Sequence, residues 1–184
     1  MVDWARWVVG DVESSDDVLK LCVEGPVSDF EERWPDFIQQ QLDPKFVSKT
    51  PCILNRKTPE KIYHVFLLGL MQSLRRKGWE LSPESRAGNG FVDIRILHRR
   101  KREAVLIELK SSEKKRDMDK DVDMALKQII DNNYRNQESL PNIFTLREYG
   151  IACFHLSSRV KGRYLERSSR SRWVEKRDPT TSFS

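Results

Sequence analysis

Three side chains on two neighbouring predicted strands have the types and spacing for chemistry: Asp93, Glu108 and Lys110. They lie in FVDIRIL and AVLIELK, two segments with the strand period of two that flank the basic run HRRKRE. If the hairpin loop is symmetric about the bond between residues 100 and 101, cross-strand partners have numbers that sum to 201. Asp93 then lies opposite Glu108. Because like charges directly opposite each other repel, this arrangement indicates that something positive is bound between them.

Alternation along the two strands separates a charged face from an apolar one. The residues that point away from Asp93, Glu108 and Lys110 are Val92, Ile94, Ile96, Val105, Ile107 and Leu109. Lys110 supplies part of the positive charge, and we expect a divalent cation to supply the rest. No Cys is near in the sequence, and His98, at the hairpin tip, is too far along the strand to contribute, which favours Mg²⁺ or Mn²⁺ over zinc. A surface salt bridge that includes Arg95 is the alternative, but parity, register and the apolar opposite face favour a site.

The elements that position these residues follow from the same patterns. Ser28 and Glu31 have capping-box spacing before a helix whose apolar residues end at Leu42. A second helix is expected from Thr58-Pro59 to Gly78, apolar nearly all round and therefore covered on more than one side. Further predicted elements are a strand in WELSPESR, a helix in 117–136, a strand in GIACFHL and an edge strand in RYLERS.

The length of 184 residues fits one domain of ordinary size with a modest accessory segment. We expect an accessory helical segment over residues 1–50 and a catalytic core over 51–166. The remaining stretch, 167–184, is rich in Ser and Arg and poor in apolar residues. Such a composition predicts a basic, mobile tail that orders only on a partner.

Charge and cysteine usage limit the class of protein. The net charge of +5 favours a polyanionic partner such as nucleic acid. Three widely spaced cysteines without a CxxC pair indicate neither a disulfide framework nor a zinc site. The N-terminus has no signal-peptide pattern, and no apolar stretch reaches the ~20 residues of a membrane span. We therefore expect a cytoplasmic or nuclear protein that is not a membrane protein.

The ordered motifs resemble those of the PD-(D/E)XK nuclease superfamily. Asp93 after GNG, followed by Glu108-Leu109-Lys110, is similar to the superfamily's Asp and ExK motifs. The branch often found after an AAA-ATPase-like domain resembles the chain more closely, through Glu60, YH and LLGL in the second helix and through ALKQI at 125–129. The resemblance implies an α/β fold with a restriction-endonuclease-like core, α-β-β-β-α-β, preceded by accessory helices. It also implies a protein partner or ATPase-like domain elsewhere.

The same resemblance implies roles for further residues. Glu60 corresponds to a helical acid that helps to hold the metal, and Gln128 to the helical glutamine of the RecB-like branch. The tyrosine of that branch would fall on Asn132, whereas this sequence has Tyr134 two residues later. On the first strand, Glu84 lies near the glycine turn and is expected to reach the cation as a supplementary ligand.

The resulting expectation is a metal-dependent nuclease that hydrolyses phosphodiester bonds, with DNA favoured over RNA as substrate. Asp93, Glu108, Lys110 and Gln128 form the predicted catalytic set, and Glu60, Asp93, Glu108 and Glu84 the predicted metal ligands. Basic groups at 75–77, 99–102 and 114–116 are predicted to flank this site. The alternatives are a catalytically inactive module of the same fold and a basic nucleic-acid-binding domain without metal.

Overall fold

A computed structural model describes residues 12–42, 59–136, 138–169 and 172–178. The elements in chain order are α2 (Val12–Glu24), α3 (Val27–Gln41), α5 (Pro59–Met71), η1 (Gln72–Lys77), β1 (Glu80–Ala87), β2 (Gly90–His98), β3 (Glu103–Ser111), η2 (Lys115–Asp117), α6 (Met118–Asp131), β4 (Thr145–Phe154), β5 (Ser157–Arg167) and β6 (Trp173–Glu175).

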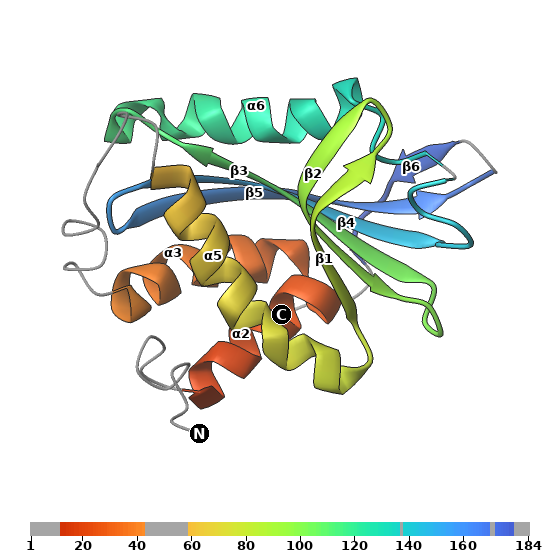
Figure 1. Ribbon diagram of the computed structural model, residues 1–184, viewed down its shortest axis with the longest axis horizontal. Helices are drawn as coiled ribbons and strands as arrows, with labels where there is room; N and C mark the ends of the chain where they lie inside the picture. The colour runs from red at the N-terminus through yellow and green to blue at the C-terminus, as the bar shows by residue number, and fades with distance from the viewer. Residues whose placement is uncertain (1–11, 43–58, 137, 170–171, 179–184) are drawn as a thin grey trace.

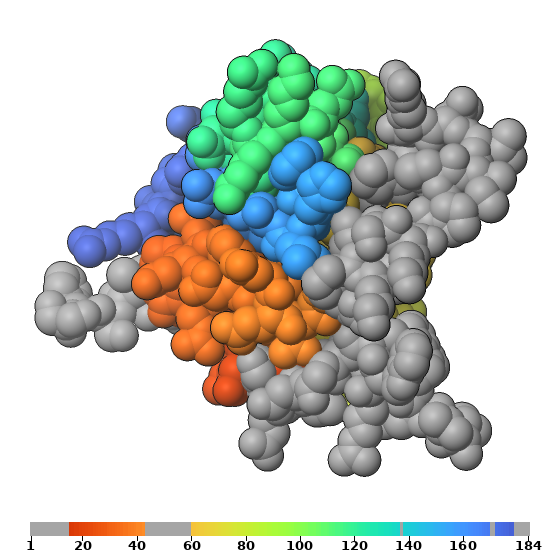
Figure 2. Space-filling model, turned by 90° about the vertical axis from the view of Figure 1, so that its left-hand side faces the viewer, coloured from red at the N-terminus to blue at the C-terminus, as the bar shows by residue number. Residues whose placement is uncertain are grey.

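One sheet with the strand order β1-β2-β3-β4-β5-β6 runs through the middle of the protein. Only β3 and β4 are parallel, and α6 connects them; the other neighbours are antiparallel. Helix α6 covers one face of the sheet, and α2, α3 and α5 lie on the other (Figure 1). Figure 2 shows the end of the β4–β5 hairpin between α6 and α3. From α5 onward, the observed order contains the predicted α-β-β-β-α-β core.

The alternation of β3 explains why helices cover both faces. Val105, Ile107 and Leu109 belong to the apolar cluster that includes buried residues of α2, α3 and α5. Ala104 and Leu106 belong to a second cluster with residues of α6. A strand that is buried on both faces is typical of a sheet with a parallel pair covered by helices.

The N-terminal helices differ from the prediction. An additional helix, α2, precedes α3, and α3 begins at Val27 rather than at a capping box. Ser28 Oγ donates to Asp29, and Glu31 accepts a hydrogen bond from the Gly162 amide of β5. The capping-box prediction was wrong because the Glu31 carboxylate is used to attach the helix to the sheet. The accessory helices are thus part of the main core.

Helix α5 lies at the expected position. It starts at Pro59 and continues through η1 to Gly78, whose φ of 87° ends the helical run as predicted. Thr58 lies outside the described residues. Val65 on α5 is 57% exposed, so one side of the helix is open, whereas Tyr63, Phe66 and Leu70 are buried.

The C-terminal segment is packed rather than free where the structure describes it. Trp173–Glu175 pair with β5 as β6, which contradicts the expectation of a mobile segment for these residues. Asp178 is buried and accepts a hydrogen bond from the Val27 amide, the first residue of α3. Asp178 also lies 3.7 Å from Arg147, whose guanidinium donates to the carbonyls of Val23, Glu24 and Gly25 at the end of α2. The apolar content of this segment is low, but ion pairs and strand pairing hold it against β5 and the start of α3.

The turn between β1 and β2 depends on glycine. Gly88 has a φ of 50°, and a Cβ there would lie 2.0 Å from the Asn132 carbonyl oxygen, beyond the end of α6. The neighbouring Asn89 amide donates to the same carbonyl. The hairpin and the end of α6 therefore pack backbone against backbone.

We predict that Gly88→Ala destabilises the protein by ~1–3 kcal/mol, because alanine would be strained in this conformation and would push against the Asn132 backbone. The corresponding fall in Tm is ~2–12 °C for a chain of this size. Asn89→Ala is the matched control, since the Asn89 side chain is exposed and its amide is retained. Thermal melts of both variants measure the effect, and equal melting temperatures for Gly88→Ala and the parent would contradict it.

Candidate active site

The predicted register of the hairpin is confirmed. The β2–β3 ladder runs from His98 opposite Glu103 to Ile94 opposite Ile107, and each pair sums to 201. The next pair in this register is Asp93 and Glu108, just beyond the last paired residues. There Asp93 Oδ2 accepts a hydrogen bond of 2.7 Å from the Leu109 amide. A side chain thus takes the place of the strand ladder, and the site lies where β2 separates from β3.

The Glu108 side chain is fully buried. Burial and, next, the negative charge of Asp93 raise the pKa of Glu108 to about 9, although Lys110 and Tyr134 act in the opposite direction. One carboxylate oxygen, Oε2, accepts a hydrogen bond of 3.2 Å from Gln128. The other, Oε1, is buried without a hydrogen-bond partner among the described residues. A cation beside Oε1 would stabilise the ionised form of this carboxylate.

Gln128 of α6 connects the two charged residues of the ExK motif. Its Nε2 donates to Glu108, and its Oε1 accepts a hydrogen bond of 2.6 Å from Lys110 Nζ. Helix α6 packs over β3 and β4 through its apolar residues, and this packing turns Gln128 toward the charged face of β3. The sequence placed Asp93, Glu108, Lys110 and Gln128 in one site, and the structure brings these four side chains together.

Tyr134 reaches the same site although its spacing departs from the family pattern. Helix α6 ends at Asp131, and the turn that follows buries Tyr134 completely. Its hydroxyl donates to the Phe91 carbonyl and accepts a hydrogen bond from Asn132 Nδ2. The motif spacing of the RecB-like branch pointed to Asn132 and left Tyr134 doubtful, because that spacing takes no account of where α6 ends in this chain. The tyrosine does lie beside Glu108, whose pKa it lowers.

Glu84 lies opposite Asp93 in the β1–β2 register, between the paired residues 83 and 85. Its φ of 42° interrupts the regular strand. The Glu84 carboxylate lies 3.9 Å from His64 Nδ1 and is 74% exposed. His64 Nε2 in turn contacts the Asp93 carbonyl oxygen at 3.1 Å, and it must donate because a carbonyl only accepts. His64 thus holds the backbone of β2, and Glu84 contacts His64.

Glu60 lies half-buried in the first turn of α5. Its charge acts on the thiol of Cys153, which is next to the end of β3 in the parallel register. Burial is the main cause of the raised pKa of that thiol, and Glu60 adds to it. Cys153 pairs with Ser111, three residues beyond Glu108, so Glu60 lies near the end of β3. Its role as a ligand remains a prediction.

Asp93 and Glu108 carry hard carboxylate oxygens, and Oε1 of Glu108, which has no hydrogen-bond partner among the described residues, is suited to accept a cation. Within the described ranges, no group of three or more His, Cys, Asp or Glu side chains is arranged to hold a metal ion. Mg²⁺ commonly binds through one or two carboxylates and keeps several waters or substrate oxygens as its other ligands. The two carboxylates fit such an ion, and the absence of Cys and His from the pair argues against zinc.

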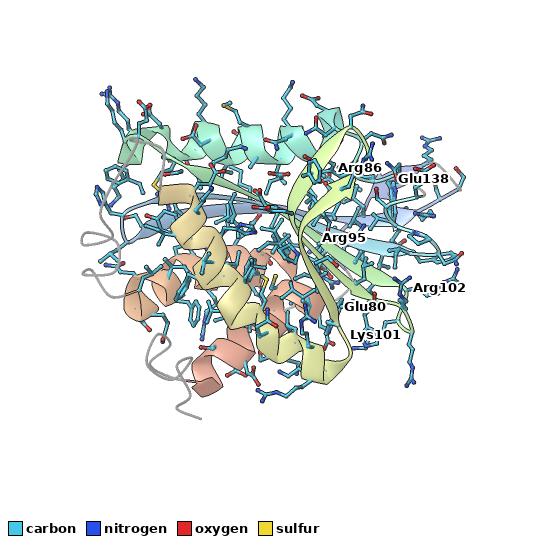
Figure 3. All side chains as sticks on the ribbon, in the orientation of Figure 1. Glu80, Arg86, Arg95, Lys101, Arg102 and Glu138 are labelled. Atoms are coloured by element: carbon cyan, nitrogen blue, oxygen red, sulfur yellow. The ribbon has the colours of Figure 1, made fainter. Side chains whose placement is uncertain are left out.

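Two of the three basic groups expected around the site lie elsewhere. Residues 99–102 form the far end of the β2–β3 hairpin, ~20 Å along the strand from Glu108. In Figure 3, Lys101 and Arg102 lie at the end of β2 opposite to Arg86. Lys101 pairs with Glu24, and Lys77 with Asp16. Residues 75–77 end η1 just before Glu80, which pairs with Leu97 at the end of β2 remote from Asp93. The prediction was therefore wrong for 75–77 and 99–102, whereas residues 114–116 follow β3.

Comparison with known families decides the identity. A model of the PD-(D/E)XK nuclease superfamily matches residues 58–161, from the start of α5 into β5. The chain belongs to the PD-(D/E)XK nuclease superfamily. The matched range holds Asp93, the ExK motif and Gln128. A comparison with curated proteins finds no match. Among the described residues, no helix is both long enough and apolar enough to cross a membrane.

We predict that Glu108 makes the metal-free protein less stable as the pH rises. Its pKa is raised above the ordinary 4.5. The folded state therefore holds this proton more tightly than the unfolded state, and stability falls between about pH 5 and 9. Glu108→Gln removes this loss and keeps an acceptor for Gln128. In chelator, the variant should melt above the parent, by a margin that grows from pH 6 to pH 9. A margin that does not change with pH would show that Glu108 is not protonated in the folded protein.

Proposed function

We propose that this protein is a Mg²⁺- or Mn²⁺-dependent nuclease that hydrolyses phosphodiester bonds in nucleic acid, with DNA preferred over RNA. The observation that carries the proposal is the pair of carboxylates, Asp93 and Glu108, next to Lys110 where β2 leaves β3. Membership of a nuclease superfamily supports it. A cation bound by the pair would polarise the phosphoryl oxygen and lower the pKa of a bound water.

The chain's own residues hold the charges in place for this reaction. Asp93 is fixed by the Leu109 amide, so its second oxygen is directed by the backbone rather than by a mobile side chain. Lys110 is oriented by Gln128 and is in position to stabilise the negative charge that grows on the phosphate. Gln128 binds Lys110 and Glu108 at once, and it therefore fixes the distance between the cationic and anionic parts of the site.

An inactive module of the same fold is the rival interpretation. Loss of activity would normally leave at least one member of the charged set replaced or turned away. Here Asp93, Glu108 and Lys110 are all present, and each has a fixed partner within the site. These contacts favour catalysis. The ATPase-like partner, the more specific branch and the cytoplasmic or nuclear location remain predictions from the sequence.

We predict that cleavage of labelled DNA requires a divalent cation and that Asp93→Ala and Lys110→Ala each lower the rate at least ~100-fold, as loss of one charge-stabilising group commonly does. Both side chains lie on the charged face rather than in the apolar clusters, so circular dichroism should report a retained fold. Lys161→Ala, which removes an exposed lysine that pairs with Asp123, is the matched control. Cleavage at the parent rate in excess chelator would exclude the metal mechanism.

A separate prediction concerns the two outer acids. We propose Glu60 as a third ligand and Glu84 as a supplementary one. Because a bound ion stabilises the folded state, Mg²⁺ should raise the Tm of the parent. Tenfold weaker binding in Glu60→Gln would reduce this rise by ~3–6 °C. Glu84→Gln should reduce it less, since Glu84 is exposed and contacts His64. The rise with Mg²⁺ is read relative to each variant in chelator. An unreduced rise in either variant would remove that acid from the ligand set.

A further inference from the structure

Phe91 is the most exposed large apolar side chain among the described residues, at 63%. It lies in β2, two residues before Asp93, a separation of ~7 Å along a strand. A phenylalanine normally contributes its ring to a core, yet here the neighbouring Val92 is buried and Phe91 faces solvent. The ring is thus an open aromatic surface on the strand that carries Asp93.

Arg86 lies directly opposite Phe91 in the β1–β2 register. Directly opposed side chains share one face of a hairpin and lie ~5 Å apart at their Cβ atoms. Arg86 is exposed, and no ion pair or hydrogen bond of its side chain occurs among the described residues. Figure 3 shows Arg86 near the turn of the β1–β2 hairpin, away from Glu80 and Lys101. Glu80 pairs with Arg99, and Lys101 pairs with Glu24. An exposed aromatic ring and a guanidinium without a partner side chain among the described residues therefore extend from directly opposed positions of the hairpin.

The position of Phe91 is fixed relative to the site by backbone contacts. Its carbonyl accepts a hydrogen bond of 2.7 Å from Tyr134, the residue that also lies beside Glu108. A Cβ at Gly90 would lie 3.1 Å from the same Tyr134 hydroxyl, so this part of β2 packs closely on the residues after α6. Tyr134 thus holds the Phe91 backbone near Glu108.

These features have the chemistry of a site for an unpaired base. Aromatic side chains bind single strands because each base has a face to stack on, and cationic side chains bind the phosphates between the bases. In a duplex the base faces are already covered by their neighbours, so a protein ring gains access only to a single strand or to a displaced base. A second copy of the chain or a protein partner would cover the ring without needing Arg86 beside it.

We propose that Phe91 stacks on an unpaired base of the substrate next to the scissile phosphate, that Arg86 binds an adjacent phosphate, and that the site therefore prefers single-stranded over double-stranded DNA. The inference rests on the proposed nuclease function for its biological meaning. Its test measures binding without cleavage, which separates the two.

The experiment compares the binding of fluorescein-labelled oligothymidylate of 20 nucleotides and of a 20-base-pair duplex by fluorescence anisotropy, with the full chain in chelator. Phe91→Ala should weaken single-strand binding by about tenfold or more, the effect of losing one stacked base. It should leave duplex binding nearly unchanged. Phe91→Trp, which keeps a stacking surface, should retain the affinity. Phe144→Ala is the control, because Phe144 is 46% exposed but precedes β4 at the far end of β3.

Thermal melts of each variant identify loss of folding, and Phe91→Trp keeps the test decisive if Phe91→Ala is unstable. Unchanged single-strand binding by Phe91→Ala would overturn the proposal, as would an equal loss for both probes. A parent dimer that Phe91→Ala converts to a monomer in size-exclusion chromatography would also overturn it, since the ring would then be an interface between copies. Phe91-dependent binding without cleavage in Mg²⁺ would support the stacking surface and contradict the nuclease function. Cleavage that does not depend on Phe91 would support the nuclease function and contradict the stacking surface.

Discussion

Two carboxylates, those of Asp93 and Glu108, repel each other at the point where β2 leaves β3, and the rest of the site depends on this repulsion. Asp93 and Glu108 occupy the first register position beyond the strand ladder, and Glu108 is fully buried. Burying an ionised carboxylate next to another is costly unless a proton or a cation compensates. The raised pKa of Glu108 favours a proton on this carboxyl when no cation is bound. A divalent cation in its place would release the proton and convert an unfavourable pair into a binding site.

The remaining structure holds this unfavourable pair in place. Gly88 allows the β1–β2 hairpin to pack against the residues that follow α6, and those residues bring Tyr134 beside Glu108. Arg135, the next residue, forms a two-point contact with the buried Glu148 of β4. Arg163 of β5 contacts the same carboxylate at 3.2 Å. Because removal of one partner would leave a buried charge uncompensated, this ion-pair group fixes the end of α6 relative to the sheet.

Local patterns predicted the parts of the site that lie on regular strands. The period of two and a symmetric loop were enough to place Asp93 opposite Glu108, whereas Gln128 was assigned to the site by the family resemblance alone. Residues outside regular elements were harder to predict. The position of Tyr134 depends on where α6 ends, and that of Glu84 on its own left-handed backbone conformation. The positions of the basic side chains depend on acids that are distant in sequence. The C-terminal strand depends on β5 as a partner, which its own composition does not indicate.

The most direct test of the account is the position of a bound cation. A crystal of the full chain soaked with Mn²⁺ and measured by anomalous scattering would locate the ion without reference to activity. If these two carboxylates bind the cation, an anomalous peak is expected within coordination distance of both Asp93 and Glu108, next to Glu108 Oε1. A crystal with a fully occupied Mn²⁺ site elsewhere and none between these two carboxylates would contradict it.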